Sequence, residues 1–430
     1  MTARKPLLIP LALGFALATA GLLLLNGTLI ATAIPALLFV CVRLLSSPRP
    51  VAHDLRIERS LSQSRAIEGD RIEIELLVEN AGTSHALVSI TDAPPAILIP
   101  REGHTQTLGR LPAGEARTLT YVAEVRRGLA SFNPVAIRSW SPWGLTSTEA
   151  DIPIETTIKA HPRYELLDPI TIRPRRTRAF AGPVKANRGG QGLDFFGCRA
   201  YTPGDDVRRI NWRAYARGDA LMVNEYDLER IADVNVILDA RARAHAQLDE
   251  ETTFDHSVRA AAALACHFLD QGNNVGLLIY GDYIQWVFSA IGRVQKERIL
   301  DELAEAQMGD KSVFEELRFI PTRLFPPRSQ LVLVSPLADE DDIETVALLA
   351  DRGYSVLLVC PHTLSLGAAA QESLDEASLA MAERILTLRR ELFLGSLSGI
   401  GTSVIDWRVD EPLRVACQGI HHARMWRHQR

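Results

Sequence analysis

The side chains with the most varied chemistry gather in one stretch of the sequence, from Gly189 to Glu225. Two adjacent carboxylates within it, Asp205 and Asp206, are of the residue type that general acid–base catalysis uses. Adjacent side chains rarely point at one atom, however, and no nucleophile or set of metal ligands accompanies this pair. We therefore favour a structural interpretation of the stretch, with partner docking and catalysis as the alternatives.

The same stretch combines arginines, carboxylates and aromatic residues, which is typical of a folded connector. We expect Tyr201, Ile210 and Trp212 to be buried, and the acidic residues to pair with arginines, because a buried charge is costly without a partner. The stretch lies between a β-rich region and an α/β region, so we predict that it clasps these two domains together. The residues assigned to this structural or docking site are Asp194, Arg199, Tyr201, Gly204, Asp205, Asp206, Arg208, Trp212, Arg217 and Glu225.

Two apolar runs near the N-terminus predict a hairpin of transmembrane helices, residues 6–25 and 29–45 of a segment spanning 1–46. A bilayer core about 30 Å thick needs ~20 apolar residues per helix; the first run fits and the second is slightly short. Positive charges lie before the first run and at or after the end of the second, where Arg43 falls, and none lies in the short turn between them. We therefore expect a multi-pass protein of the cell inner (cytoplasmic) membrane, with the bulk of the chain in the cytoplasm. A cleaved signal peptide is the alternative.

Short alternating strands with turn residues between them fill residues 53–162. Arg71 to Glu79 and Thr118 to Val125, for example, alternate apolar and polar side chains, as a half-buried strand does. This pattern predicts an all-β immunoglobulin-like sandwich. Residues 163–230 then form the connector that contains the stretch described above.

From residue 231 to 430 short apolar strands alternate with helical segments, which predicts a doubly wound α/β domain with a parallel sheet. Ligands of such sheets bind at the carboxyl ends of the strands. Asp239 ends the first strand, at the position where the von Willebrand factor A fold carries an Asp-x-Ser-x-Ser loop that holds a divalent metal. Here Arg241 and Arg243 replace both serines, and cationic side chains do not ligate a cation.

This degenerate metal-site loop, Asp239, Arg241 and Arg243, leaves two interpretations open. Asp239 caps the following helix or pairs with a nearby arginine. Alternatively, the two arginines replace the charge of the metal and receive a carboxylate from a partner protein.

Several classes of function are disfavoured by composition and by missing motifs. The chain of 430 residues has a net charge of -5, so charge gives no reason to expect nucleic-acid binding. Its five scattered cysteines form no C-x-x-C pair and are expected to be reduced. The sequence has no phosphate-binding P-loop, no G-x-S-x-G nucleophile motif and no H-E-x-x-H zinc motif. We expect no enzymatic activity, no cofactor and no bound metal.

With these segments in place, the chain resembles the bacterial and archaeal "domain of unknown function 58" family over essentially its whole length. The resemblance rests on a long signature, G-x-[ED]-F-x-x-x-R-x-Y-x-x-G-D-D-x-R-x-I-x-W-x-x-x-A-R followed by V-x-E. The matching residues begin at Gly192 and end at Glu225. Two positions depart from the pattern: Asn211 stands where an acidic residue is common, and Asn224 where arginine is frequent.

The resemblance implies a von Willebrand factor A-like domain and a partnership with MoxR-type AAA+ ATPases, beside which such proteins are often encoded. Family members are viewed as adaptors or co-chaperones of that ATPase. We therefore expect a membrane-anchored, non-enzymatic adaptor that docks the ATPase or client proteins. The alternatives are a divergent hydrolase that uses Asp205 and Asp206, and a metal-dependent protein-binding module.

Overall fold

The computed structural model describes most of the chain, in two compact units, Met1–His161 and Pro162–Arg430. Each unit has hydrophobic cores of its own. The described residues are 5–45, 55–82, 85–140, 147–170, 177–178, 184–218, 220–247, 251–309, 324–337, 340–362, 376–398 and 402–418.

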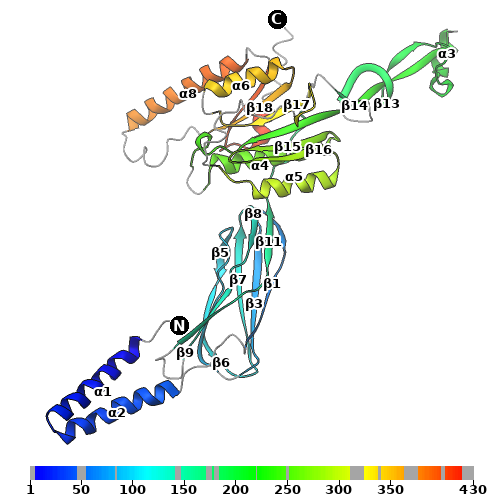
Figure 1. Ribbon diagram of the computed structural model, residues 1–430. Coiled ribbons are helices and arrows are strands. Elements are labelled where there is room, and N and C mark those ends of the chain that lie inside the picture. The colour runs from blue at the N-terminus through cyan, green and yellow to red at the C-terminus, as the bar shows by residue number, and fades with distance from the viewer. Residues whose placement is uncertain are drawn as a thin grey trace. The chain divides into compact units, whose positions relative to one another are not determined.

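The chain begins with two helices, α1 (Lys5–Leu23) and α2 (Gly27–Leu45), which lie side by side as a hairpin (Figure 1). Asn26 stabilises the turn because its side-chain oxygen accepts hydrogen bonds from the Thr28 amide and hydroxyl. The helices approach closely at Gly21, where an added Cβ would meet the backbone nitrogen of Ile30 at 3.0 Å.

The prediction of transmembrane helices is wrong. In the parts of the chain that the structure describes, no helix is both long enough and apolar enough to cross a membrane. Each N-terminal helix has 19 residues, and each includes a charged residue near one end, Lys5 or Arg43. The apolar length is therefore shorter than the ~20 residues that a bilayer core requires. The predicted multi-pass location in the inner membrane is wrong for the same reason.

The rest of the first unit consists of β-sheets. In β3 every second side chain is buried, from Ile72 to Asn80, which matches the alternation in its sequence. Two apolar clusters form the core, one around Leu76 and Ile137 and the other around Ile74 and Tyr121.

The first of its sheets has the order β1 (Leu55–Leu61), β3 (Arg71–Asn80), β7 (Ala116–Val125) and β5 (Leu98–Gly103). The second has the order β10 (Ser147–Ile152), β9 (Val135–Trp140), β4 (His85–Thr91) and β6 (Gln106–Leu111). The third has the order β2 (Arg65–Ile67), β11 (Thr157–His161) and β8 (Gly128–Ser131).

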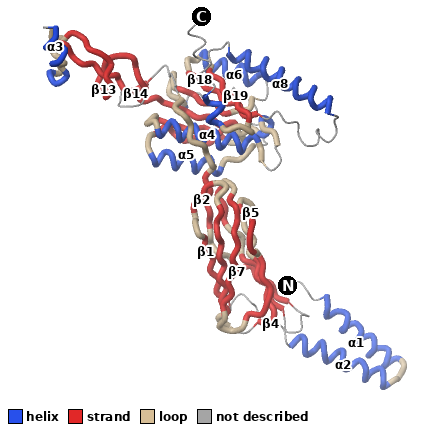
Figure 2. The backbone as a smooth tube through the Cα atoms, turned by 180° about the vertical axis from the view of Figure 1, so that it is seen from behind, coloured by secondary structure: helices blue, strands red, loops and turns tan. Residues whose placement is uncertain are grey.

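The second unit is built on one large sheet with helices on both faces. The main path through the sheet is β16 (Ile284–Ala290), β15 (Asn274–Tyr280), β14 (Met222–Asp239), β17 (Gln330–Val334), β18 (Ser355–His362) and β19 (Ser403–Arg408). Helices α4 (Thr253–Asp270) and α5 (Arg293–Glu305) cover one face, and α6 (Glu340–Asp351) and α8 (Glu376–Ser398) lie on the other (Figures 1 and 2).

The sheet of this unit is mixed, so the prediction of a parallel, von Willebrand factor A-like domain is not upheld. The strands from β15 to β19 on the main path are parallel, but the edge strand β16 is antiparallel to β15. Two further strands, β12 (Thr177–Arg178) and β13 (Val184–Ala200), are antiparallel to β14. The predicted fold class is therefore wrong both in its membrane helices and in this sheet.

A long ribbon extends from the sheet because β14 is much longer than β15 and β17, its parallel neighbours. Its C-terminal half lies in the sheet, whereas its N-terminal half pairs with β13 and leads to the short helix α3 (Trp212–Gly218) (Figure 1). We call this ribbon the arm, and residues 199–225 the arm tip. The register of β13 against β14 shifts three times, at Lys185/Gly189, Gly190/Phe195 and Phe195/Gly197.

Candidate functional site

Arg199 organises the arm tip from the end of β13. Its guanidinium donates two hydrogen bonds to the Asp205 carboxylate, at 2.6 and 2.7 Å, and a third to Glu225 at 2.8 Å. Asp205 also accepts from the amide and the hydroxyl of Thr202, at 2.9 and 3.0 Å. The turn between them contains Gly204, whose φ of +108° suits a residue without a Cβ. The hydrogen bonds from Arg199 and Thr202 lower the pKa of the Asp205 carboxyl.

Asp206 has a different task from its neighbour. It caps the short 3₁₀ helix η2 (Val207–Arg209), where its side chain accepts from the Arg208 amide at 3.0 Å. The two adjacent carboxylates therefore serve separate local structures and do not converge on one point. Asp205 is held ionised against an arginine, which makes it a poor proton donor or acceptor near neutral pH. This geometry gives no support to a hydrolase that uses the pair.

The two positions that depart from the family signature contact each other. Asn211 donates from Nδ2 to Oδ1 of Asn224 at 2.8 Å, and its own Oδ1 accepts from the Ala214 amide in the first turn of α3. A neutral amide pair thus stands where the family pattern would place an acidic residue and an arginine. The two departures are complementary, because Asn211 and Asn224 are hydrogen-bond partners of each other.

The outer surface of the arm tip is aromatic, apolar and basic. Trp212 and Tyr215 are 62% and 41% exposed, with their rings edge to face at 6.4 Å between centroids. The prediction that Trp212 is buried is wrong, since α3 is a single short helix with no buried residue. Arg208, Arg213 and Arg217 are exposed on the same short segment.

Most of the predicted connector residues meet in this tip, but they contact one another. Tyr201 is half-buried and its amide donates to the Leu221 carbonyl oxygen at 2.8 Å. Asp194 belongs to β13, and its side chain lies outside the described part of the structure. The polar contacts described above are all made within the tip, which supports a self-contained fold of this segment.

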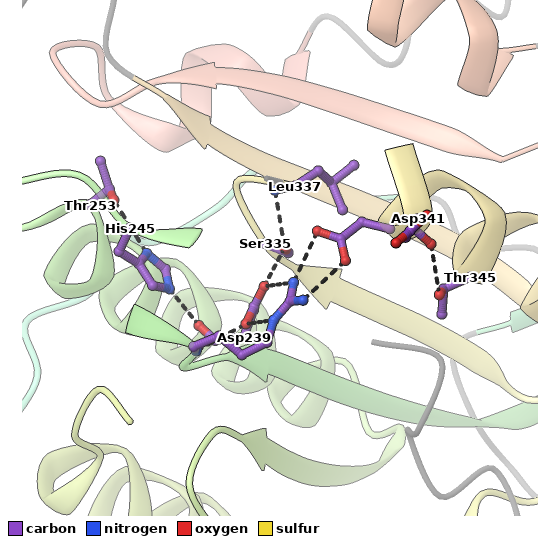
Figure 3. Close-up of polar contacts among 9 residues, drawn as sticks. Asp239, His245, Thr253, Ser335, Leu337, Asp341 and Thr345 are labelled. Carbon is purple, nitrogen blue, oxygen red and sulfur yellow. Dashed lines mark hydrogen bonds and ion pairs between the residues drawn. The ribbon is translucent and has the colours of Figure 1, made fainter. Parts of the chain in front are cut away.

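A second cluster lies at the carboxyl end of β14, where Arg241 bridges two buried aspartates (Figure 3). Its guanidinium donates to both oxygens of Asp239, at 2.9 and 2.7 Å, and to both oxygens of Asp342, at 3.1 and 3.0 Å. Ser335 donates its hydroxyl to Asp239 at 2.7 Å. All four residues are at most 4% exposed.

Arg241 is therefore the cation of this cluster. Burial alone would lower the pKa of Arg241, but its hydrogen bonds to Asp239 and Asp342 and their negative charges raise it overall. The second carboxylate that Arg241 binds comes from α6 of the same chain, so Arg241 is paired within the chain. Binding of a partner's carboxylate at this loop stays a prediction. Arg243 is exposed and does not join the bridge to the two aspartates.

Sequence reasoning identified Asp239 and Arg241 but missed Asp342. The acidic start of α6, Glu340-Asp341-Asp342, was the available signal. Nothing in the spacing of residues 239 and 342 shows that β14 and α6 meet. That contact arises because the carboxyl ends of β14 and β17 are adjacent in the sheet, and α6 begins just after β17.

The described surface also has an apolar hollow of about 510 Å³ beside the edge strand β16. Trp286 and Phe288 line it, together with Leu324 and Pro326. Among the described residues that line it, Asn274 and Ser289 have polar side chains and none is an acid or a base of the kind that acid–base chemistry uses.

The model of a family described as "Protein of unknown function DUF58" matches residues 197–368 of this chain, which supports the resemblance to that family. The matched span includes the whole arm tip and the cluster around Arg241. No curated protein matches the chain.

Among solved structures, the chain is similar to the cupredoxin domain of amoB from Nitrosocaldus yellowstonii, with 10% identity and a TM-score of 0.19, over 26% of this chain and 90% of that one. It is also similar to a FixG-related protein from Vibrio parahaemolyticus, with 8% identity and a TM-score of 0.18, over 25% and 96% of the two chains. Likenesses at this level carry no functional conclusion.

Proposed function

We propose that this chain is a non-enzymatic adaptor whose arm tip docks a partner protein. The observation that carries the proposal is the exposed pair Trp212 and Tyr215 beside three exposed arginines, on a segment that Arg199 holds in shape. Tryptophan, tyrosine and arginine are the residue types that contribute most to protein–protein binding energy. The polar groups beneath them are already paired with one another, as in a scaffold for a binding surface.

The partner that we propose is a MoxR-type AAA+ ATPase, on the strength of the family resemblance. An ATPase would supply the nucleotide chemistry for which this sequence has no P-loop. The basic and aromatic tip would then fit an acidic surface of the ATPase with an apolar pocket at its centre, because opposite charges steer the encounter and aromatic anchors supply the affinity.

The test is a binding titration between the purified full chain and a purified MoxR-type ATPase from the same organism, with ATP, with ADP and without nucleotide. We expect binding in at least one nucleotide state. We also expect the double variant Trp212→Ala and Tyr215→Ala to weaken it by a factor of about a thousand, since hot-spot residues cost about 2 kcal/mol or more each and about 1.4 kcal/mol is tenfold.

The matched control is Tyr283→Ala with Phe288→Ala, which removes two aromatic residues that are 68% and 71% exposed elsewhere in the same unit. This control should bind as the wild type does. If the ATPase fails to bind in all three nucleotide states, the proposed partner is wrong. If it binds but the tip variant binds equally well, the arm tip is not the docking surface.

A further inference from the structure

Helix α8 carries an apolar stripe that the described part of the chain leaves exposed. Met381, Ile385, Leu388 and Leu392 are 62%, 55%, 49% and 78% exposed. They follow one another at intervals of four, three and four residues, so they lie along one side of the helix. This is the spacing of the seam of a coiled coil, where two helices pack side by side.

Among its described side chains, α8 makes polar contacts with the sheet through Arg390. Arg390 donates to the Asp406 carboxylate at 2.9 Å and to the Cys360 carbonyl oxygen at 3.2 Å. Of the α8 side chains that the structure describes, none is buried. Helices in proteins owe most of their stability to the packing of an apolar face. The stripe is therefore the face on which α8 can still gain stability.

The charged residues beside the stripe favour the packing of α8 against a second copy of α8 in antiparallel orientation. When Ile385 packs against Leu388 of the other copy, Met381 packs against Leu392 of that copy. Helical spacing then places Arg384 beside Glu391 of the other copy, and the two-fold symmetry repeats this pair. Both side chains are exposed and of opposite charge.

A parallel pair would have the opposite consequence. Flanking positions five residues apart meet in a parallel coiled coil, so Arg384 would face Arg389 of the other copy. Two like charges at that position are destabilising. In the antiparallel pair Arg389 faces the neutral Ala382 instead. The charge pattern thus distinguishes the two orientations.

We propose that α8 is a dimerisation helix, which pairs with α8 of a second copy of this chain in an antiparallel, two-fold arrangement. The four apolar residues form the centre of the interface, and two Arg384–Glu391 ion pairs close its edges. The proposal is independent of the adaptor function and of the arm tip.

The first test is the mass of the full chain in solution, measured by sedimentation equilibrium or light scattering up to about 100 µM. The wild type should approach twice the monomer mass. The variant Ile385→Asp with Leu388→Asp should stay at the monomer mass, because it places charges in the apolar centre. The control Leu166→Asp alters an apolar residue that is 81% exposed outside α8 and should leave the dimer intact. Circular dichroism verifies that each variant is folded.

The second test uses charge reversal. Arg384→Glu alone, or Glu391→Arg alone, should weaken dimerisation by about tenfold, since each change turns two attractive pairs into repulsive ones. The variant that combines both changes should regain most of the wild-type affinity. A monomeric wild type would overturn the proposal, as would a dimer that survives the two aspartate substitutions. Failure of the combined variant to recover would overturn the antiparallel arrangement.

Discussion

Arg241 shows how a single residue can determine the charge and the contacts at the carboxyl ends of the sheet strands. Arg241 stands at the position of the first serine in an Asp-x-Ser-x-Ser loop. Its buried positive charge pairs with two carboxylates at once. The guanidinium is suited to this because it is planar and can donate pairs of parallel hydrogen bonds. The carboxyl end of β14 is thereby tied to the first turn of α6.

Removing Arg241 should therefore destabilise the second unit strongly. Arg241→Ala leaves Asp239 and Asp342 buried without their cation, and breaking a buried ion pair from one side costs roughly 3–5 kcal/mol. Arg241→Lys keeps the charge but cannot donate paired hydrogen bonds to both carboxylates, so its loss should be smaller. Chemical denaturation followed by circular dichroism measures both.

Arg243→Ala is the control for this prediction, because Arg243 is exposed and lies two residues further along the same loop. Its stability should lie within about 0.5 kcal/mol of the wild type, as is usual for surface substitutions. Wild-type stability in Arg241→Ala would show that the buried bridge does not hold α6 to the sheet.

At the scale of elements, the arm tip depends on one ion-pair network for its shape. Because the pKa of Asp205 is lowered in the folded tip, its stabilising contribution is complete above the unfolded pKa of about 3.9. The contribution is lost as the pH falls through the lower, folded value. The tip should therefore keep its structure at pH 5 and open only at a pH below about 4.

Fluorine NMR of protein labelled with fluorotryptophan measures this, with the Trp212 signal identified from its absence in Trp212→Phe. The Trp212 signal should shift below about pH 4 in the wild type and be displaced already at pH 7 in Asp205→Asn. Asp206→Asn is the matched control, since Asp206 caps only η2 and does not contact Arg199 in the described structure. Equal effects of the two substitutions would contradict the central place of Asp205.

The elements also show what the sequence could and could not predict. Alternation in Arg71–Asn80 marks a strand correctly, because burial of one face leaves a period of two in the sequence. The residue types of the arm do not reveal whether their partners lie near or far in the sequence, so the contacts within the arm tip are not predictable from them. Aromatic residues are usually buried, which predicts a core position for Trp212. The helix α3 has only seven residues, none of them buried, so Trp212 remains exposed.

The N-terminal helices and the sheet illustrate the same limit. The two apolar runs do form helices. The apolar run in the sequence does not, however, determine where the helix begins and ends, and so does not determine its apolar length. For the sheet, the alternation of strands and helices locates the strands β15 to β19, but it misses the start of β14, which begins at Met222. The alternation does not reveal the direction of each strand. Strand β16 is antiparallel to β15 because only a short turn connects the two.

At the scale of the whole molecule, the chain is two units with separate cores. Ile74 is fully buried in a cluster made only of residues from the first unit, and Leu238 is fully buried in a cluster made only of residues from the second. Truncation of either side chain to alanine should cost about 2–5 kcal/mol, through lost burial and an unfilled cavity. The loss should fall on one unit in each case, because the affected contacts are confined to it.

Hydrogen exchange with mass spectrometry resolves this prediction by segment. Ile74→Ala should speed exchange in peptides from β3 and β7 and leave β14, β17 and β18 as in the wild type. Leu238→Ala should do the reverse, because opening of each core is a cooperative local event. If either substitution accelerated exchange equally in both sets of strands, the chain would unfold as one cooperative body. Separate responses in the two sets of strands would show that each core opens on its own.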